Sequence, residues 1–330
     1  MGNKIGWVDN LRAVACMMVV MIHATTYYVT TGMVVGEHNW DMANILNSLS
    51  RVGVPLFFMI SGLLFFGERS ANKKHFTRIA CCIVFYSVIA LIYIACFTRI
   101  GFWPSLYALL QKPVFYHLWF FYAIAVIYLL SPLICVKPVS GRYLAGVIVI
   151  LAIIANPNTS KLTLGNVHLL PVNLYIVGDT FYYLLYALAG RAIGMMETER
   201  RGVSGLAALG FVLSVVLIIN GTKKQLFING NFADTFYIYS GPLVFVAAVS
   251  LLVWFKNVLP DPIGWLGVVS RHSLAIYGFH AIIVNLMRNQ HWVFSSHPLL
   301  DIFWVFGVAL GLSLLLSMGL QKLDTRRLVS

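Results

Sequence analysis

One apolar stretch near the start of the chain carries two side chains that are rare in such stretches. It reads RAVACMMVVMIH, with Arg12 at one end and His23 eleven positions later. At 100° per residue, eleven residues turn a helix through about 1100°, within roughly 20° of three full turns, and rise about 16 Å. The spacing therefore predicts that both side chains share one helix face.

Two interpretations of this pair remain open at the level of the sequence. A neutral histidine is a good general base near pH 7, and ionisable groups within a membrane usually face a bundle interior or a wet cavity. A snorkelling arginine and a histidine that bonds to a neighbouring helix would explain Arg12 and His23 without chemistry.

A second polar pattern lies late in the chain, in the segment SLAIYGFH. Ser273, Tyr277 and His280 are spaced i, i+4, i+7, which places them on one face of a helix. Three hydrogen-bonding groups in a row line a cavity in some proteins. They join neighbouring membrane helices in many others, and the pattern alone favours this second use.

A third pattern is the basic segment GERSANKKHFTR, which lies between two apolar runs. It contains Arg69, Lys73, Lys74 and Arg78 within ten positions. Four cations suit a phosphate-rich ligand. Short basic loops also set the orientation of membrane proteins and contact lipid headgroups, which is the commoner role.

Two further residues are candidates for lining a cavity. Arg51 lies near one end of the second apolar run, a few residues before Pro55. Trp119 lies in YHLWFFY at the start of the fourth run, where an aromatic belt at the membrane surface is the default explanation. Aromatic rings also stack on sugars, which is the functional alternative for Trp119.

The composition excludes a soluble globular protein. The chain has 330 residues, of which 60% are hydrophobic and 10% charged, whereas a soluble domain carries about 25% charged residues. The net charge of +12 comes from short basic clusters between apolar runs. Such clusters contact the anionic headgroups of membrane lipids, so we expect no nucleic acid as a partner.

Ten apolar runs approach the length of about 20 residues that a transmembrane helix needs. They lie roughly at 10–31, 45–67, 77–98, 117–136, 142–156, 178–196, 203–220, 235–255, 266–287 and 299–320. The expected fold class is all-α: a polytopic integral membrane helix bundle of about ten transmembrane helices. Residues 1–330 are expected to form one domain, with no soluble domain.

The distribution of lysine and arginine predicts the orientation of the bundle. Most of these residues fall in loops on the side of the N-terminus, so both termini are expected to be cytoplasmic. The five cysteines match no metal-ligand spacing, and we expect no metal.

Taken together, these segments resemble the membrane acyltransferase-3 family. The resemblance covers essentially the whole chain, and it is carried by DNLRAVACMMVVMIH, VPLFFMISGLLF, Arg78 after the second run, HLWFF and SLAIYGFH. It implies a multi-pass enzyme of the bacterial inner membrane that moves an acetyl group from cytoplasmic acetyl-CoA to a sugar hydroxyl. Other segments, such as GDTFYY and GRAIGMM, resemble the branch of the family that O-acetylates enterobacterial common antigen.

That branch implies N-acetylglucosamine in a lipid-linked or polymeric glycan as the acceptor. The resemblance also implies roles for single residues. His23 matches the family histidine and would be the catalytic base, while Arg12 matches the family arginine and would bind acetyl-CoA. Arg78 matches a basic position that also binds acetyl-CoA, and Lys73 and Lys74 match it more loosely, because many relatives have an arginine run where this chain has KKHFTR.

The late motif implies the groups that would stabilise the oxyanion of an acyl transfer. Ser273, Tyr277 and His280 are its members, and each is a candidate hydrogen-bond donor. Two functions of other classes remain as alternatives. One is a carrier or flippase for a lipid-linked sugar in which His23 handles a proton, and the other is a structural protein of envelope assembly that would not need His23.

Overall fold

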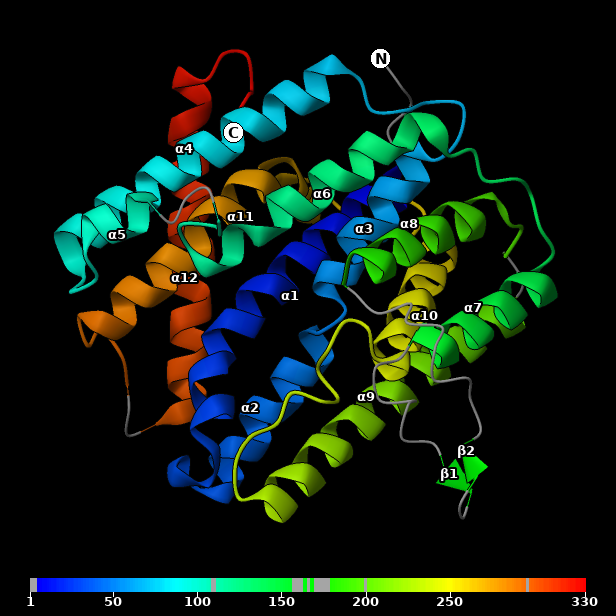
Figure 1. Ribbon diagram of the computed structural model, residues 1–330, viewed down its shortest axis with the longest axis horizontal. Coiled ribbons are helices and arrows are strands. Elements are labelled where there is room, and N and C mark those ends of the chain that lie inside the picture. Colours follow the sequence, from blue (N-terminus) through cyan, green and yellow to red (C-terminus); the bar gives the residue numbers. More distant parts are fainter. Residues whose placement is uncertain are drawn as a thin grey trace.

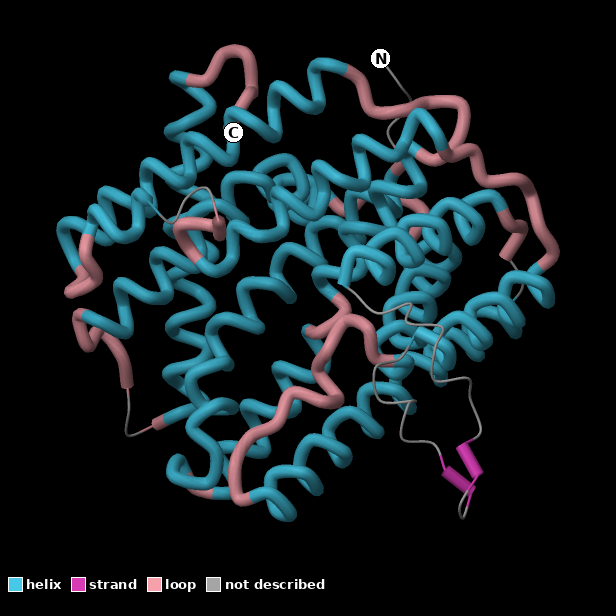
Figure 2. The backbone as a smooth tube through the Cα atoms, in the orientation of Figure 1, coloured by secondary structure: helices cyan, strands magenta, loops and turns pink. Residues whose placement is uncertain are grey.

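The computed structural model describes residues 5–107, 111–155, 163–164, 167–168, 179–198, 201–294 and 297–330. Nearly all of this is helical, as Figure 2 shows. The exception is a small antiparallel pairing of two-residue strands, β1 (Thr163–Leu164) and β2 (Val167–His168), with Thr163 opposite His168. The expected helical fold class is therefore confirmed, apart from these two strands.

The helices follow the apolar runs of the sequence. They are α1 (Gly6–Thr31), α2 (Glu37–Ser50), α3 (Gly53–Phe65), α4 (Lys73–Phe97), α5 (Phe102–Tyr107), α6 (Trp119–Leu130), α7 (Gly141–Ala155), α8 (Asp179–Met195), α9 (Arg201–Asn229), α10 (Pro242–Val258), α11 (Gly264–Asn289) and α12 (Pro298–Leu323). Short 3-10 turns precede α2 (Gly32–Val35) and flank α6 (Tyr116–Leu118 and Ser131–Leu133).

The expected count of about ten membrane helices is not confirmed. Within the described residues, seven helical segments are long and apolar enough to cross a membrane, and α2 and α3 together make one of them. Each of the ten predicted runs contains a helix, but α7, α8 and α10 have only 15, 17 and 17 residues. A hydropathy run shows that a segment is apolar, whereas the length of its helix depends on where turns interrupt it.

Helix α1 is the central element of the bundle. It crosses the middle of Figure 1 and packs against α2, α3, α10, α11 and α12. Leu11, Val20 and Ala24 are fully buried on it. The helices α9 and α12 are peripheral: in the most apolar stretch of each, only 22% and 28% of the residues are buried. Both helices expose leucine and aromatic side chains. Such apolar outer faces are expected where lipid surrounds a bundle.

The second predicted span is broken at Arg51 and Val52. Its first part, α2, starts at Glu37, eight residues before the predicted run, because its polar residues find partners inside the bundle. Asn44 donates to the carbonyl of Ile219 at 3.0 Å, and Asn47 donates to the hydroxyl of Thr25 at 2.8 Å. Paired amides of this kind are tolerated between helices, so one face of α2 is buried although it carries polar side chains.

Helix α3 restarts next to α1 because small residues allow close packing there. A Cβ on Gly53 would come within 2.9 Å of the carbonyl oxygen of Ala15. Pro55 lies in the first turn of α3, where its missing N–H leaves no helical hydrogen bond unmade. On the other side of α3, a Cβ on Gly62 would overlap the backbone of Ala187 in α8. These contacts fix α3 between α1 and α8.

Candidate functional site

The candidate site lies along the contact between α1 and α11. Arg12 Nη1 donates to Ser270 Oγ at 3.5 Å, and the ring centroids of His23 and His280 lie 5.0 Å apart. Successive residues of α1 thus meet successive residues of α11, so the two helices run parallel. Both Arg12 and His23 face α11, as their eleven-residue spacing predicts. We call the two ends of this contact the Arg12 end and the His23 end.

A cavity of about 380 Å³ opens at the Arg12 end. Arg12, Arg78 and Arg271 supply its positive charge, and Ser273 and Tyr277 also line it from α11. The remaining wall is largely apolar and comes from α3, α4 and α6, including Phe57, Ile60, Ser61, Leu64, Phe65, Ile79, Phe120, Phe121, Ile124 and Tyr128. Its volume lies in the lower part of the range for small-molecule sites.

Arg12 is fixed in the cavity wall by an acidic neighbour. Its Nη1 forms an ion pair with Asp9 Oδ1 at 2.9 Å, and Ser270 Oγ donates to the same carboxylate oxygen at 3.0 Å. The side chains of Arg12 and Asp9 are 27% and 25% exposed, so the pair is partly open. Of these three groups, Asp9 and Ser270 were not predicted as site residues, although the i, i+3 spacing of Asp9 and Arg12 is a signal for such a pair.

Arg78 reaches the cavity from α4 and also binds the C-terminal segment. Its Nη2 donates to the main-chain oxygen of Ser330 at 2.7 Å. Tyr86, two turns further along α4, donates to the oxygen of Val329 at 2.7 Å. Ser330 is only 1% exposed, so the last residues pack between α4 and the end of α12. The sequence contained no signal for this contact.

Asp324 folds this C-terminal segment into place. Its carboxylate accepts hydrogen bonds from the backbone N–H groups of Leu328, Val329 and Ser330 at 3.0, 2.8 and 2.9 Å. Partial burial acts to raise the pKa of Asp324, but these three donors outweigh it and lower the pKa below its usual value. The charged carboxylate of Asp324, which we call the Asp324 cap, therefore holds segment 324–330 beside Arg78.

Lys73 and Lys74 do not line the cavity. They begin α4 with exposed side chains, directly after Asn72, whose side chain accepts a hydrogen bond from the backbone N–H of Lys74 at 3.1 Å. His75, the next residue, does line the cavity. Lys73 and Lys74 thus lie on the surface near the Arg12 end, where only their long-range charge acts on the cavity.

At the His23 end, two rings pack against the histidine of α1, and two more pack against one of them, His280. The ring centroid of His23 lies 5.3 Å from that of Tyr116 and 5.0 Å from that of His280, and His280 in turn lies 5.4 Å from His117 and 5.6 Å from Tyr277. His280 and His117 are buried, whereas Tyr116 is 52% exposed. The half-buried ring of His23 makes no hydrogen bond to any described residue.

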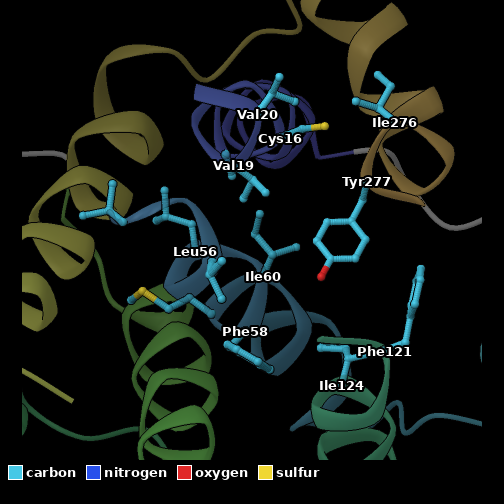
Figure 3. Packing of buried hydrophobic residues seen from close by; sticks show 14 of the residues in the cluster. Cys16, Val19, Val20, Leu56, Phe58, Ile60, Phe121, Ile124, Ile276 and Tyr277 are labelled. Carbon is cyan, nitrogen blue, oxygen red and sulfur yellow. The ribbon is translucent and has the colours of Figure 1, made fainter. Parts of the chain in front are cut away.

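Tyr277 lies between the two ends of the site. Figure 3 shows its ring extending from α11 into the space between Ile60 and Phe121. Its hydroxyl donates to the main-chain oxygen of His117. The cavity reaches this tyrosine but not His23, so Tyr277 is the lining residue of α11 that lies nearest the His23 end.

The remaining predicted cavity residues divide into two groups. Ser273 and Tyr277 line the cavity, whereas His280, Arg51 and Trp119 do not. Arg51 lies over the ring of Tyr237 at 4.3 Å, and Trp119 stacks on Tyr183 with ring centroids 5.4 Å apart. Arg51 and Trp119 therefore pack against aromatic rings outside the cavity lining.

The oxyanion candidates of the late motif have their polar hydrogens engaged. Ser273 Oγ donates to the carbonyl of Ser270 at 2.9 Å, and Tyr277 donates to His117. His280 Nδ1 lies 3.0 and 2.7 Å from the carbonyls of Ile276 and Tyr277, which only an N–H can satisfy. None of the three is free to donate toward the cavity in this arrangement.

No group of three or more histidine, cysteine, aspartate or glutamate side chains is placed to hold a metal ion within the part of the chain that the structure describes. The described histidines of the His23 end, His23, His117 and His280, also form no such group. His117 and His280 each direct one ring nitrogen to a backbone carbonyl.

The fold and the site indicate the class of protein. The chain is a multi-pass helical membrane protein with a cationic cavity at one end of a parallel helix pair and a cluster of histidines at the other. Comparison with known families then gives the identity: the family described as "Acyltransferase domain" matches residues 5–319, and the chain belongs to this family of membrane acyltransferases. No curated protein matches the chain, and no solved structure does.

Proposed function

We propose that the protein is an O-acetyltransferase that moves the acetyl group of acetyl-CoA to a sugar hydroxyl. The observation that carries this proposal is the cavity lined by Arg12, Arg78 and Arg271, which reaches Tyr277, whose ring packs on His280, the neighbour of His23. Coenzyme A combines a strongly anionic nucleotide with a long, weakly polar arm. A cavity that combines arginines with a largely apolar wall suits both parts.

In this proposal, Arg12 and Arg78 hold the phosphates or the first amide of the pantetheine arm. Both are arginines whose guanidinium groups present several fixed donors to phosphate oxygens. A cavity of about 380 Å³ has room for the arm and the acyl group, with the nucleotide outside on the basic surface. Lys73 and Lys74 attract the nucleotide there through their charge.

The Arg12 end then faces the cytoplasm, where acetyl-CoA is made. Arg69, Lys73, Lys74 and Arg78 gather at this end, and short basic loops are typical of the cytoplasmic side. We place the protein in the bacterial inner membrane with both termini in the cytoplasm. The acceptor enters from the His23 end, where Tyr116 is half exposed.

For the chemical step, we assign the role of general base to His23. An unprotonated ring nitrogen of His23 takes the proton of the sugar hydroxyl while the hydroxyl oxygen attacks the thioester carbonyl. The C–S bond then breaks, the acetyl group stays on the sugar oxygen, and the departing thiolate receives the proton from His23. The products are an O-acetyl sugar and free coenzyme A.

The ring of Tyr277 has to turn away for donor and acceptor to meet, because it separates the cavity from His23. The same motion breaks its hydrogen bond to the oxygen of His117. The hydroxyl is then free to donate to the oxyanion that develops on the thioester carbonyl. Tyr277 is therefore both the inner wall of the donor site and our candidate oxyanion donor.

The acceptor that we propose is N-acetylglucosamine in lipid-linked enterobacterial common antigen. The support is the sequence resemblance together with the aromatic cluster of Trp119, Tyr183 and Tyr239 near Arg51. Stacked aromatic rings that lie next to an arginine offer a surface for a sugar and a donor for its oxygens. A carrier or flippase for such a glycolipid would use the same surface.

The test uses the purified protein in nanodiscs with acetyl-CoA labelled in the acetyl group and a lipid extract that contains the glycan precursors. We expect label in the glycolipid that alkaline hydrolysis releases as acetate. Label that stays in acetyl-CoA while the glycolipid changes membrane face would support the carrier instead. Coenzyme A released without labelled glycolipid would keep the acyltransferase but reject this acceptor.

A further inference from the structure

One ring nitrogen of His280 is hydrogen-bonded to backbone carbonyls, and the other has no hydrogen-bond partner among the described residues. Its Nδ1 lies 3.0 Å from the oxygen of Ile276 and 2.7 Å from that of Tyr277, and carbonyl oxygens only accept hydrogen bonds. The proton of the neutral ring is therefore on Nδ1. Its Nε2 is a lone-pair acceptor, it is buried, and it has no hydrogen-bond partner among the described residues.

The neighbouring rings leave one donor for that nitrogen. Tyr277 donates its hydroxyl to the oxygen of His117, and His117 directs Nε2 to the oxygen of Gly278 at 3.1 Å. The other nitrogen of His117, Nδ1, is then an acceptor as well. Among the described residues, three rings pack against His280, and of these only that of His23 has an N–H that is not already engaged.

The geometry allows the contact. The ring centroids of His23 and His280 are 5.0 Å apart with an interplanar angle of 47°, a separation at which two imidazole edges come within hydrogen-bond reach after a small rotation. His23 makes no hydrogen bond to a described residue that would oppose this rotation. His280 is fully buried on α11 and keeps its position through its own two backbone contacts.

We propose that His280 is the positioning residue for His23. Its Nε2 accepts a hydrogen bond from one ring N–H of His23, which fixes the tautomer of His23 and turns the other, unprotonated nitrogen toward the acceptor hydroxyl. His280 takes no proton during the reaction; it stabilises the imidazolium of His23 that forms and then disappears. This inference rests on the proposed function, and it replaces a donor role for His280 with an acceptor role.

Three variants separate positioning from packing. His280→Ala removes the acceptor, and His280→Gln keeps an amide oxygen near the place of Nε2. His272→Ala is the matched control: it is a buried histidine on the same helix that lies outside the cavity lining and bonds Ser317 Oγ at 2.8 Å. It therefore reports the cost of losing a buried histidine contact on α11 without touching His23.

We expect His280→Ala to lower kcat by about 10- to 1000-fold with KM for acetyl-CoA within about twofold of wild type. His280→Gln should recover most of kcat, and His272→Ala should leave kcat nearly unchanged even if its Tm falls. Equal kcat losses in His280→Ala and His280→Gln, or a loss that scales with Tm in all three variants, would overturn the proposal.

A second readout needs no enzymatic activity. In protein with ¹⁵N-labelled histidine, we expect His23 to be a single tautomer in wild type and in His280→Gln, and a mixture in His280→Ala. His23→Ala assigns the resonances. If wild type shows no acetyl transfer, this measurement still decides whether His280 orients His23, so failure of the proposed function and failure of the positioning role are distinguishable. An unchanged His23 tautomer in His280→Ala would contradict the positioning role.

Discussion

The rings of His23 and His280 lie 5.0 Å apart, on two helices that run parallel through the bundle although 257 positions separate the residues in sequence. The same two helices bring Arg12 to Ser270 at 3.5 Å. One helix contact thus connects the charged end of the site with its histidine end. Tyr277 lies between them and belongs to the same contact.

Arg12 is the first residue whose role can be measured. Its guanidinium is fixed by Asp9 at the cavity wall. Truncating Arg12 should therefore remove one or two charge-assisted hydrogen bonds to acetyl-CoA. Such bonds contribute about 1.5–3 kcal/mol, so Arg12→Ala should raise KM for acetyl-CoA about 10- to 100-fold. Arg142→Ala, an exposed arginine on α7, is the control and should leave KM unchanged. A reduced kcat with normal KM would instead place Arg12 in the chemical step.

Arg78 and the neighbouring lysines should differ in their effects on donor binding. Arg78 lines the cavity, whereas the side chains of Lys73 and Lys74 are exposed outside it. We expect Arg78→Ala to raise KM for acetyl-CoA about tenfold or more at any salt concentration. Lys74→Ala should change it about twofold or less, and only at low salt, because exposed charges are screened. Equal effects of the two variants would mean that the donor binds on the surface outside the cavity.

The predictability of this site differs from residue to residue. The common face of Arg12 and His23 follows from helical periodicity alone, and the apolar runs correctly predict where helices occur. The pairing of α1 with α11 does not follow from the sequence, because periodicity gives the buried face of a helix and not the helix that covers it. Similarly, the predicted run at 45–67 begins eight residues after α2 does, since hydropathy counts Asn44 as polar and cannot register its buried partner.

The contact of Arg78 with the C-terminal segment could not be predicted either. It depends on Asp324, whose carboxylate binds three backbone N–H groups of the last residues. Nothing in the segment DTRRLVS distinguishes this cap from an exposed basic tail. The role of His280 as an acceptor likewise depends on the rotamer that sets Nδ1 against the carbonyls of Ile276 and Tyr277, which the residue types in SLAIYGFH do not specify.

The close packing of α3 on α8 predicts a sharp difference between glycines. A methyl group on Gly62 would overlap the backbone of Ala187, whereas a Cβ on Gly307 in α12 meets nothing within 4 Å. We expect Gly62→Ala to lower the free energy of unfolding by about 1–3 kcal/mol. Gly307→Ala should raise it by up to about 1 kcal/mol, because alanine has the higher helix propensity and meets no neighbour there. Thermal unfolding in nanodiscs measures both; equal stabilities would show that α3 and α8 are not in backbone contact.

Docking of the C-terminal segment should depend on pH through Asp324. The three N–H donors lower the pKa of this carboxyl in the folded state, so the charged form stabilises docking above the pKa of the free group, about 3.9. This stabilisation is lost as the pH falls through the lowered folded pKa. Amide hydrogen exchange of residues 328–330 should therefore be protected at neutral pH and lose its protection in acid.

Asp324→Asn tests the same cap at neutral pH. It should speed exchange at residues 328–330, because the amide replaces a charged acceptor by a neutral one. Asp261→Asn, a change at an exposed aspartate outside the helices, should leave that exchange unchanged. Slow exchange in Asp324→Asn would mean that the contacts of Arg78 and Tyr86 hold the segment without the cap.

The most direct test of the account is acetyl transfer by His23→Ala. The variant and the wild type, both folded in nanodiscs, receive labelled acetyl-CoA and the glycolipid acceptor, with His38→Ala at an exposed position of α2 as the control. We expect label in the glycolipid with wild type and His38→Ala, and a loss of at least about 100-fold with His23→Ala while acetyl-CoA still binds. Equal transfer by His23→Ala and wild type would contradict the account, because the base would then lie elsewhere.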